Sequence, residues 1–222
     1  LFESDHLLDL TSPNTNYRKI SIEKLQRTID VCNQLKQFFS NRSSNIGLIT
    51  NVGGFTEEAN LGGAACAERM DNLRDSLSRL NLHGVEILPQ TMPPFPWLLG
   101  GQRFHNLFTD PEQISDFCQE AAMRICLDVS HSSLFCNRHT HSLADFLEEV
   151  LPFTAHLHLA DALGFDGEGL QIGEGSVDFK MVAEKVGRLA PETSWIPEIW
   201  QGHEDCGQGF WIALNRLQAV GF

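Results

Sequence analysis

The sequence predicts an α/β fold in which helices cover a parallel sheet. Segments with helical spacing of apolar residues alternate with short apolar runs along most of the chain. No Asn-Gly pair marks a hairpin between two consecutive strands. Such alternation without hairpins is typical of βαβ units and therefore of a parallel sheet.

Short apolar runs mark the expected strands, at residues 46–50, 85–88, 125–129, 155–160 and 195–200. The third run, Ile125-Cys126-Leu127, is apolar at consecutive positions. A continuous apolar run predicts a strand that is buried on both faces, as in a parallel sheet covered by helices.

Amphipathic segments mark the expected helices, at residues 21–39, 64–82, 141–151, 177–189 and 209–220, with a further helix beginning at 110–112. Ser21 is expected to cap the first helix, Gly84 to end the second, and Pro111 to occupy the first position of its helix. The long segment from 89 to 108 is expected to be a functional loop, because long loops in compact domains usually are.

Composition limits the classes of function. The 222 residues suit one domain, expected over 1–222, and the start at Leu1 indicates a fragment of a longer chain. The chain contains no run of 18 apolar residues, so no membrane span is expected. The formal charge of -13 disfavours binding to nucleic acid, which requires cations. Six cysteines without a Cys-x-x-Cys pair indicate reduced thiols and a cytoplasmic location.

Ionisable residues stand at or near the ends of the strands: Glu86, Asp128, His158 and Glu198. The carboxyl ends of parallel strands meet at one rim, where βα-barrels build their active sites. Carboxylates converging there would repel one another unless a cation lies among them, and this donor set suits one divalent ion, Mn²⁺, Mg²⁺, Co²⁺ or Zn²⁺. Two alternatives stay open: each residue is a hydrogen-bonded buried group, or Asp128 caps a following helix whose first turn carries His131.

Two histidines of one strand compete for the role of ligand. His156 and His158 are two residues apart and share a face of the strand. His158 is preferred because it lies nearer the C-terminal end, and His156 is then expected to be a lower core residue.

Four short motifs together resemble the xylose isomerase-like TIM-barrel superfamily, in its sugar-phosphate isomerase/epimerase branch, which is related to the endonuclease IV class. They are Asp128-x-x-His131, His158-Leu-x-Asp161, Gly173-Glu174-Gly175 and Pro197-Glu198. The resemblance implies a (β/α)8 TIM barrel that is incomplete at its N-terminus in this chain, since the family barrel has eight strands.

The resemblance also implies roles for residues. Glu86, Asp128, His158 and Glu198 match the metal ligands, and Glu86 and Glu198 match the pair of catalytic carboxylates. His131 matches a contact to a substrate hydroxyl. Apart from the resemblance, Trp97 and Arg103 are expected to contact the sugar from the long loop at 89–108, with packing of the loop aromatics on helices as the alternative. Asn51 and Asp161 complete the residues expected to contact the substrate. Asp161 is also expected to orient His158 or the loop that follows it.

The implied function is a metal-dependent sugar or sugar-phosphate isomerase or epimerase, in which two glutamates transfer a proton next to a carbonyl. The loop after the His158 strand lacks the Arg of the epimerases, so a non-catalytic ligand-binding barrel within a larger sugar-acid biosynthesis protein is an alternative. Asn51 and Glu168 stand where the DNA-repair branch has histidines, which disfavours the further alternative, a metal-dependent phosphoesterase. The expected partner is a small sugar or sugar phosphate, and a homo-oligomer stays open.

Overall fold

The computed structural model describes residues 6–39, 45–98 and 101–222. The chain divides into two compact units. The first comprises residues 1–90 and 97–107, and the second comprises residues 91–96 and 108–222. Nothing in the sequence marks this division within the domain predicted over 1–222, and each unit is described by itself.

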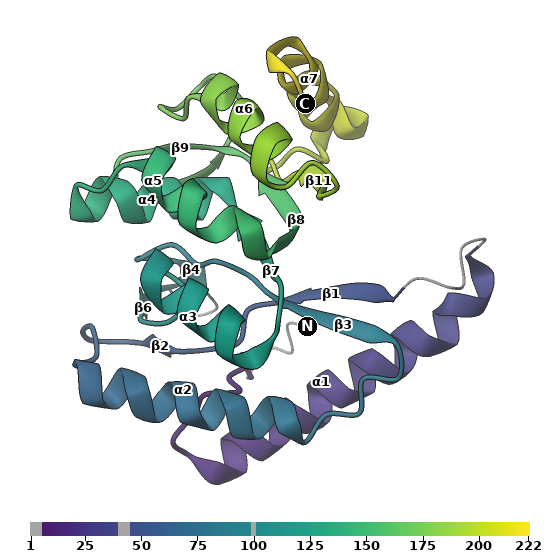
Figure 1. The fold of residues 1–222 in the computed structure, drawn as a ribbon, viewed down its shortest axis with the longest axis vertical. Helices are drawn as coiled ribbons and strands as arrows, with labels where there is room; N and C mark the ends of the chain where they lie inside the picture. The colour runs from purple at the N-terminus through teal and green to yellow at the C-terminus, as the bar shows by residue number, and fades with distance from the viewer. Residues whose placement is uncertain (1–5, 40–44, 99–100) are drawn as a thin grey trace. The chain divides into compact units, whose positions relative to one another are not determined.

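The first unit contains two of the predicted parallel strands. β1 (Ile46–Thr50) pairs with β3 (Val85–Pro89), with Ile46 opposite Val85 and Thr50 opposite Pro89. α1 (Thr15–Leu35) contacts α2 (Gly63–Ser78) and β3, and Figure 1 shows both helices beside the strand pair. Both strands have the bounds predicted from their apolar runs, to within one residue.

The helices of the first unit differ at their ends from the prediction. Asn14 caps α1 by accepting the backbone N–H groups of Asn16 and Tyr17, so the helix begins before the predicted cap, Ser21. Ser21 is fully buried inside the helix, where its hydroxyl accepts the N–H of Asp9. A short 3₁₀ turn, η1 (Lys36–Phe38), follows α1.

The second helix also ends earlier than predicted. α2 stops at Ser78, before the predicted end at residue 82. Gly84 has a φ of +85° in the turn that leads into β3, where the N–H of Val85 donates to the carbonyl of Leu82. Gly84 therefore forms part of the turn that precedes β3, and it is not the residue that ends α2.

The segment predicted as a long loop contains short strands. β4 (Trp97–Leu98) pairs with β5 (Gly101–Gln102), and β6 (Phe104–His105) pairs with β2 (Phe55–Thr56), in both cases antiparallel. Residues 99 and 100 of the predicted loop lie outside the described residues.

The second unit contains the other three predicted parallel strands. They lie in the order β11-β8-β7, with β8 (Thr154–Leu159) between β7 (Ile125–Asp128) and β11 (Ser194–Pro197). Leu127 and Leu157 are opposite one another in the register and are fully buried. Burial of apolar strand residues against covering helices explains why these runs were recognisable in the sequence.

The helices of this unit cover the sheet. They are α3 (Pro111–Ala121), α4 (Val129–His139), α5 (Leu143–Val150), the 3₁₀ turn η2 (Leu151–Phe153), α6 (Phe179–Leu189) and α7 (Glu204–Val220). α5 contacts α3, α4 and α6 (Figure 1). The predicted start of α3, with Pro111 at its first position, is confirmed, and Asp110 caps the helix by accepting the N–H of Gln113 at 3.1 Å. In the described part of the chain, no helix is both long and apolar enough to cross a bilayer.

Three features of the second unit differ from the strands and helices expected from the sequence. α4 begins directly after β7, where the prediction extended the strand to residue 129. An antiparallel hairpin follows β8, made of β9 (Asp161–Leu163) and β10 (Gly167–Leu170). α7 also begins five residues before the predicted position and is kinked, with Asp205, Cys206 and Gly207 in left-handed conformations.

Candidate metal centre

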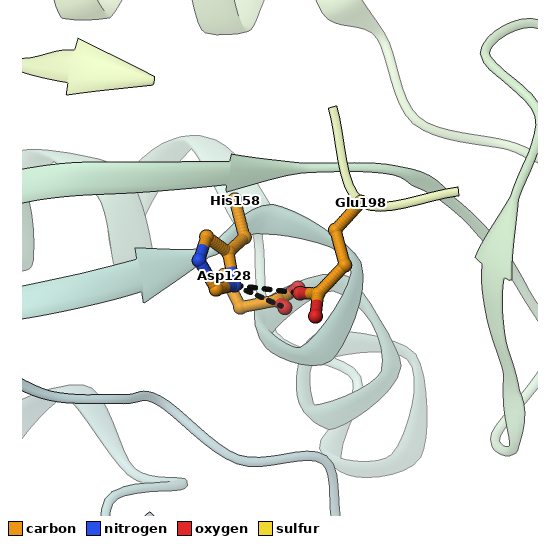
Figure 2. A group of neighbouring side chains, drawn as sticks. All are labelled: Asp128, His158 and Glu198. Carbon is orange, nitrogen blue, oxygen red and sulfur yellow. Dashed lines mark ion pairs between the residues drawn. The ribbon is translucent and has the colours of Figure 1, made fainter. Parts of the chain in front are cut away.

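Three of the predicted ligands meet at the carboxyl ends of neighbouring strands in the second unit. Asp128 is the last residue of β7, His158 is the fifth of the six residues of β8, and Glu198 follows β11 directly. One ligand atom from each lies within 4.8 Å of the others. Figure 2 shows the three side chains pointing toward one another. The strand register explains the meeting, because Asp128 and Ile196 both stand opposite His158.

The closest contact in the group is between the imidazole and a carboxylate. His158 Nδ1 lies 2.6 Å from Glu198 Oε2 and 3.8 Å from Asp128 Oδ2. The side chains of Asp128 and His158 are 3% and 8% exposed, whereas that of Glu198 is 53% exposed. The centre is therefore buried on the side of the strands and open on the side of Glu198.

The electrostatics of the two carboxylates differ. Burial raises the pKa of Asp128 to about 6, and the nearby Glu198 acts in the same direction, while His131 and His158 oppose it. Burial is the largest single effect on Glu198 and favours its neutral acid, but the hydrogen bond and charge of His158, together with the charge of His131 and a hydrogen bond with Asp128, outweigh burial and lower the pKa of this carboxyl. Glu198 is thus ionised at neutral pH, and Asp128 is held ionised only at a cost.

These residues fit a divalent cation. Two carboxylates and one imidazole are donors that Zn²⁺, Mn²⁺ and Co²⁺ accept, and Mg²⁺ binds to the carboxylates. A cation would also offset the cost of ionising the buried Asp128 beside Glu198. Because His158 shares its Nδ1 with a carboxylate in the hydrogen bond, binding of an ion through this atom would displace a proton.

Asp128 also caps the helix that follows it. Its Oδ1 accepts the backbone N–H of His131 at 2.9 Å, while its Oδ2 faces the imidazoles of His131 and His158. The alternative left open by the sequence, a capping Asp before a helix with His131 in its first turn, is therefore correct. It is compatible with a ligand role, because the two carboxylate oxygens face different groups.

His131 lies against this centre with both ring nitrogens engaged. Nδ1 is 2.9 Å from the carbonyl of Thr91 and 3.3 Å from Asp128 Oδ2, and Nε2 is 3.3 Å from Glu168 Oε2. Burial disfavours the charged imidazole, but Asp128 and Glu168 outweigh burial and raise the pKa of His131 to about 9. The predicted contact of His131 with a substrate hydroxyl would compete with these interactions.

Two residues lie beside the centre that were not predicted as site residues. Thr91 is fully buried, and its hydroxyl accepts the N–H of Asp128 at 2.9 Å. Glu168 lies in β10 of the β9–β10 hairpin, and its side chain contacts His131. The Asp166-Gly167 pair in this segment is a turn signal that could have indicated the hairpin, whereas nothing local to Thr91 indicates its position.

Asp161 holds the loop that follows it in the chain, which is one of the roles predicted for this residue. Its carboxylate accepts the backbone N–H groups of Ala162, Gly173 and Val177, at 2.8 to 2.9 Å, and it is 1% exposed. It therefore holds the glycine-rich loop. A substrate contact is disfavoured because the side chain is buried and already accepts three hydrogen bonds.

His156 is not the core residue expected from the sequence. It is half-buried, and its Nδ1 lies 2.7 Å from Ser194 Oγ at the start of β11. The preference for His158 as the candidate ligand agrees with the group that the structure brings together.

Glu86, the fourth predicted ligand, belongs to the first unit. It is half-buried and is the second residue of β3, opposite Gly47. Asp128 ends its strand, whereas Glu86 stands three residues before the end of its own strand. Its roles as ligand and as catalytic carboxylate stay predictions.

Three predicted substrate contacts also belong to the first unit. Asn51 follows β1, and its Oδ1 accepts the N–H of Gly53 at 2.8 Å. Trp97 is 57% exposed, and Arg103 pairs with Glu57 at 3.2 Å. The contacts of Asn51, Trp97 and Arg103 with a substrate stay predictions.

Solved structures with the same fold include several sugar epimerases. A D-tagatose 3-epimerase-like protein superimposes with a TM-score of 0.69 at 22% identity, covering 99% of this chain and 76% of that one. D-psicose 3-epimerase from Clostridium cellulolyticum gives 0.65 at 13% identity, covering 96% and 74%. The 3-keto-D-glucoside 4-epimerase of E. coli gives 0.64 at 16% identity, covering 96% and 76%. At these identities the likeness establishes the fold.

Two sequence comparisons agree with this fold. An uncharacterised protein of Methanocaldococcus jannaschii is 28% identical over 130 residues, and the match spans 54% of this chain but only 40% of that protein. The family model described as the xylose isomerase-like TIM barrel matches residues 2–213. The chain therefore belongs to the xylose isomerase-like TIM-barrel family.

Proposed function

We propose that this chain is a divalent-metal-dependent sugar isomerase or epimerase. The observation that carries the proposal is the meeting of Asp128, His158 and Glu198 at the ends of three neighbouring parallel strands. Membership of the xylose isomerase-like family supports it. The names of the solved sugar epimerases that share the fold favour the same class of reaction.

The reaction class requires a base that takes a proton from a carbon next to a carbonyl, and an acid that returns one. Glu198 suits this role because its side chain is 53% exposed and its pKa is lowered, so that it is an ionised acceptor at neutral pH. In the metal-free protein, the 2.6 Å contact with His158 orients this carboxylate.

A divalent ion held by Asp128, His158 and Glu198 would polarise the carbonyl oxygen and offset the negative charge that develops when the proton leaves. An epimerase also needs an acid or base on the opposite face of the carbon. Glu86 is the predicted second carboxylate, and a Glu86→Gln variant tests this role separately.

The proposal is tested by solvent exchange. The protein is loaded with Mn²⁺ and incubated in D₂O with D-tagatose, D-fructose and their phosphate esters, and loss of the C–H signal next to the carbonyl is followed by NMR. We expect exchange with at least one ketose, and a loss of about a hundredfold or more in Glu198→Gln. Glu192→Gln is the matched control, because Glu192 is exposed and lies outside the group.

Measuring the metal content of the protein distinguishes two ways in which the proposal could fail. Elemental analysis should find about one Mn²⁺ or Zn²⁺ per chain. A protein that takes up neither ion at saturation is not a metal-dependent isomerase. A protein that binds metal and ketose but catalyses no exchange would favour the alternative of a non-catalytic ligand-binding barrel.

A further inference from the structure

The β9–β10 hairpin brings a third carboxylate to the candidate metal centre. Glu168 lies in β10 between two glycines, and its side chain is 16% exposed. Its Oε2 is 3.3 Å from Nε2 of His131, whose Nδ1 is 3.3 Å from Asp128 Oδ2. The three side chains form a carboxylate–imidazole–carboxylate chain that ends at a candidate metal ligand.

The backbone next to Glu168 is held on both sides. The N–H of Gly169 donates to the hydroxyl of Ser130 at 3.1 Å, and its carbonyl accepts the N–H of Trp200 at 2.8 Å. Ser130 precedes His131, and Trp200 lies two residues after Glu198. The hairpin is thus fixed to the segments that carry His131 and Glu198, which preorganises Glu168.

A glycine is required at this junction. Gly169 has a φ of +70°, and a Cβ at this position would lie 3.2 Å from the Cβ of Trp200. The close approach and the left-handed backbone both favour glycine. The local structure therefore serves to place the hairpin against the segment after β11.

His131 is poorly placed to bind a substrate itself, because its two nitrogens already face Thr91 and Glu168. Glu168 directs Oε2 toward the imidazole, and within the described residues its other oxygen, Oε1, has no hydrogen bond or ion pair, so it can accept a hydrogen bond. Sugar hydroxyls are hydrogen-bond donors, and hydrogen bonds to a charged acceptor are the strong ones.

We propose that Glu168 binds a hydroxyl group of the sugar at the candidate metal centre, with His131 behind it as a positioning residue. The inference rests on the proposed function and replaces the direct His131 contact implied by the family resemblance. Glu168 is then a binding residue that selects for a hydroxyl at one position of the substrate.

The first test measures binding without turnover. D-tagatose and D-fructose are titrated by calorimetry into the Mn²⁺-loaded wild type, Glu168→Gln and Glu174→Gln. We expect the affinity for the bound ketose to fall by about tenfold to a hundredfold in Glu168→Gln. The control Glu174 lies in the same glycine-rich segment, is 61% exposed and pairs with Arg216, so its variant should bind within about twofold of wild type.

Mn²⁺ affinity shows whether the loss is specific. Glu168 is outside the group of candidate ligands, so Glu168→Gln should bind Mn²⁺ within about threefold of wild type. A parallel loss of Mn²⁺ and ketose affinity would overturn the proposal, because the residue would then act on the metal and not on the sugar.

The second test examines the contact itself. The ring signals of ¹⁵N-labelled histidines are recorded with Mg²⁺, and those of His131 are assigned from a His131→Asn variant. They should shift in Glu168→Ala, and unchanged signals would overturn the positioning role.

The outcomes also separate this inference from the proposed function. If the metal-loaded wild type binds neither ketose and catalyses no exchange with the ketoses or their phosphate esters, both fail. If the wild type binds a ketose and Glu168→Gln binds it equally well, only the assignment of Glu168 fails.

Discussion

Replacing Asp128 with Asn should stabilise the metal-free protein and abolish its response to divalent ions. The carboxylate is 2% exposed and lies beside Glu198. Asn has the same size and is an equally good N-cap, so the hydrogen bond from the N–H of His131 is kept. The substitution therefore removes a buried charge and leaves the helix start in place.

The magnitude follows from the pKa of Asp128, which burial raises from 3.8 to about 6. Below about pH 4 the group is protonated in the folded and unfolded states and carries no penalty. The penalty grows between pH 4 and 6 and is complete above 6. A difference of about two pH units corresponds to about 3 kcal/mol. Because His131 and His158 lose an ionic partner in the variant, we expect a net stabilisation of about 1 to 3 kcal/mol at pH 7.5.

In the presence of Mn²⁺, wild type should become more stable than Asp128→Asn. Wild type gains about 3 kcal/mol at a free Mn²⁺ concentration of a hundred times Kd, whereas Asp128→Asn should gain little. Thermal unfolding in EDTA and in Mn²⁺ measures both effects, with a shift of roughly 2 to 4 °C for each kcal/mol. Asp128→Ala is the control, since it loses the cap and should be about 1 kcal/mol less stable than Asp128→Asn. The reasoning is refuted if Asp128→Asn melts below wild type in EDTA, or gains as much from Mn²⁺.

Four further outcomes are expected. Glu198→Gln should weaken Mn²⁺ binding more than tenfold by calorimetry, and an unchanged affinity would remove Glu198 from the ligand set. Mn²⁺ affinity should fall as the pH drops below about 6, where Asp128 becomes protonated, and a flat profile between pH 5 and 7 would contradict this. Asp161→Asn should cost about 1 to 3 kcal/mol in chemical denaturation, because one of three backbone N–H groups loses its acceptor. Gly169→Ala should lower the melting temperature, whereas Gly187→Ala, with open space on the α6 surface, should add about 0.5 to 1 kcal/mol, and equal effects would show that the backbone at Gly169 is unstrained.

The strands were predictable because their signal is local. Each parallel strand is a short apolar run, and burial on both faces requires this composition wherever the strand lies in the sheet. Asp128 was recognisable because it stands where an apolar run ends, and Glu198 because it interrupts the run predicted as a strand over 195–200, which in fact ends at Pro197; an unpaired charge would be costly at either position.

α4 was not predictable from the same kind of signal. Its sequence from Val129 to His139 contains Ser130, Ser132 and Ser133, which have modest helix propensity, and the helix is stabilised by the Asp128 cap and by burial of its apolar residues, among them Leu134 and Phe135. The ends of α1 and α2 were misplaced because caps depend on side chains that a periodicity search does not weigh.

The sequence alone determined the alternation of helices and parallel strands and the set of residues able to carry chemistry. Only the tertiary structure decided which of them meet. Asp128 and His158 are thirty positions apart in the chain and become neighbours through the register of β7 and β8. In the same way the β9–β10 hairpin places Glu168 beside His131. The carboxylate of Asp161 binds backbone N–H groups of the glycine-rich loop. Periodicity constrains neighbours within a turn or a strand, whereas contacts between distant segments depend on the packing of the whole unit.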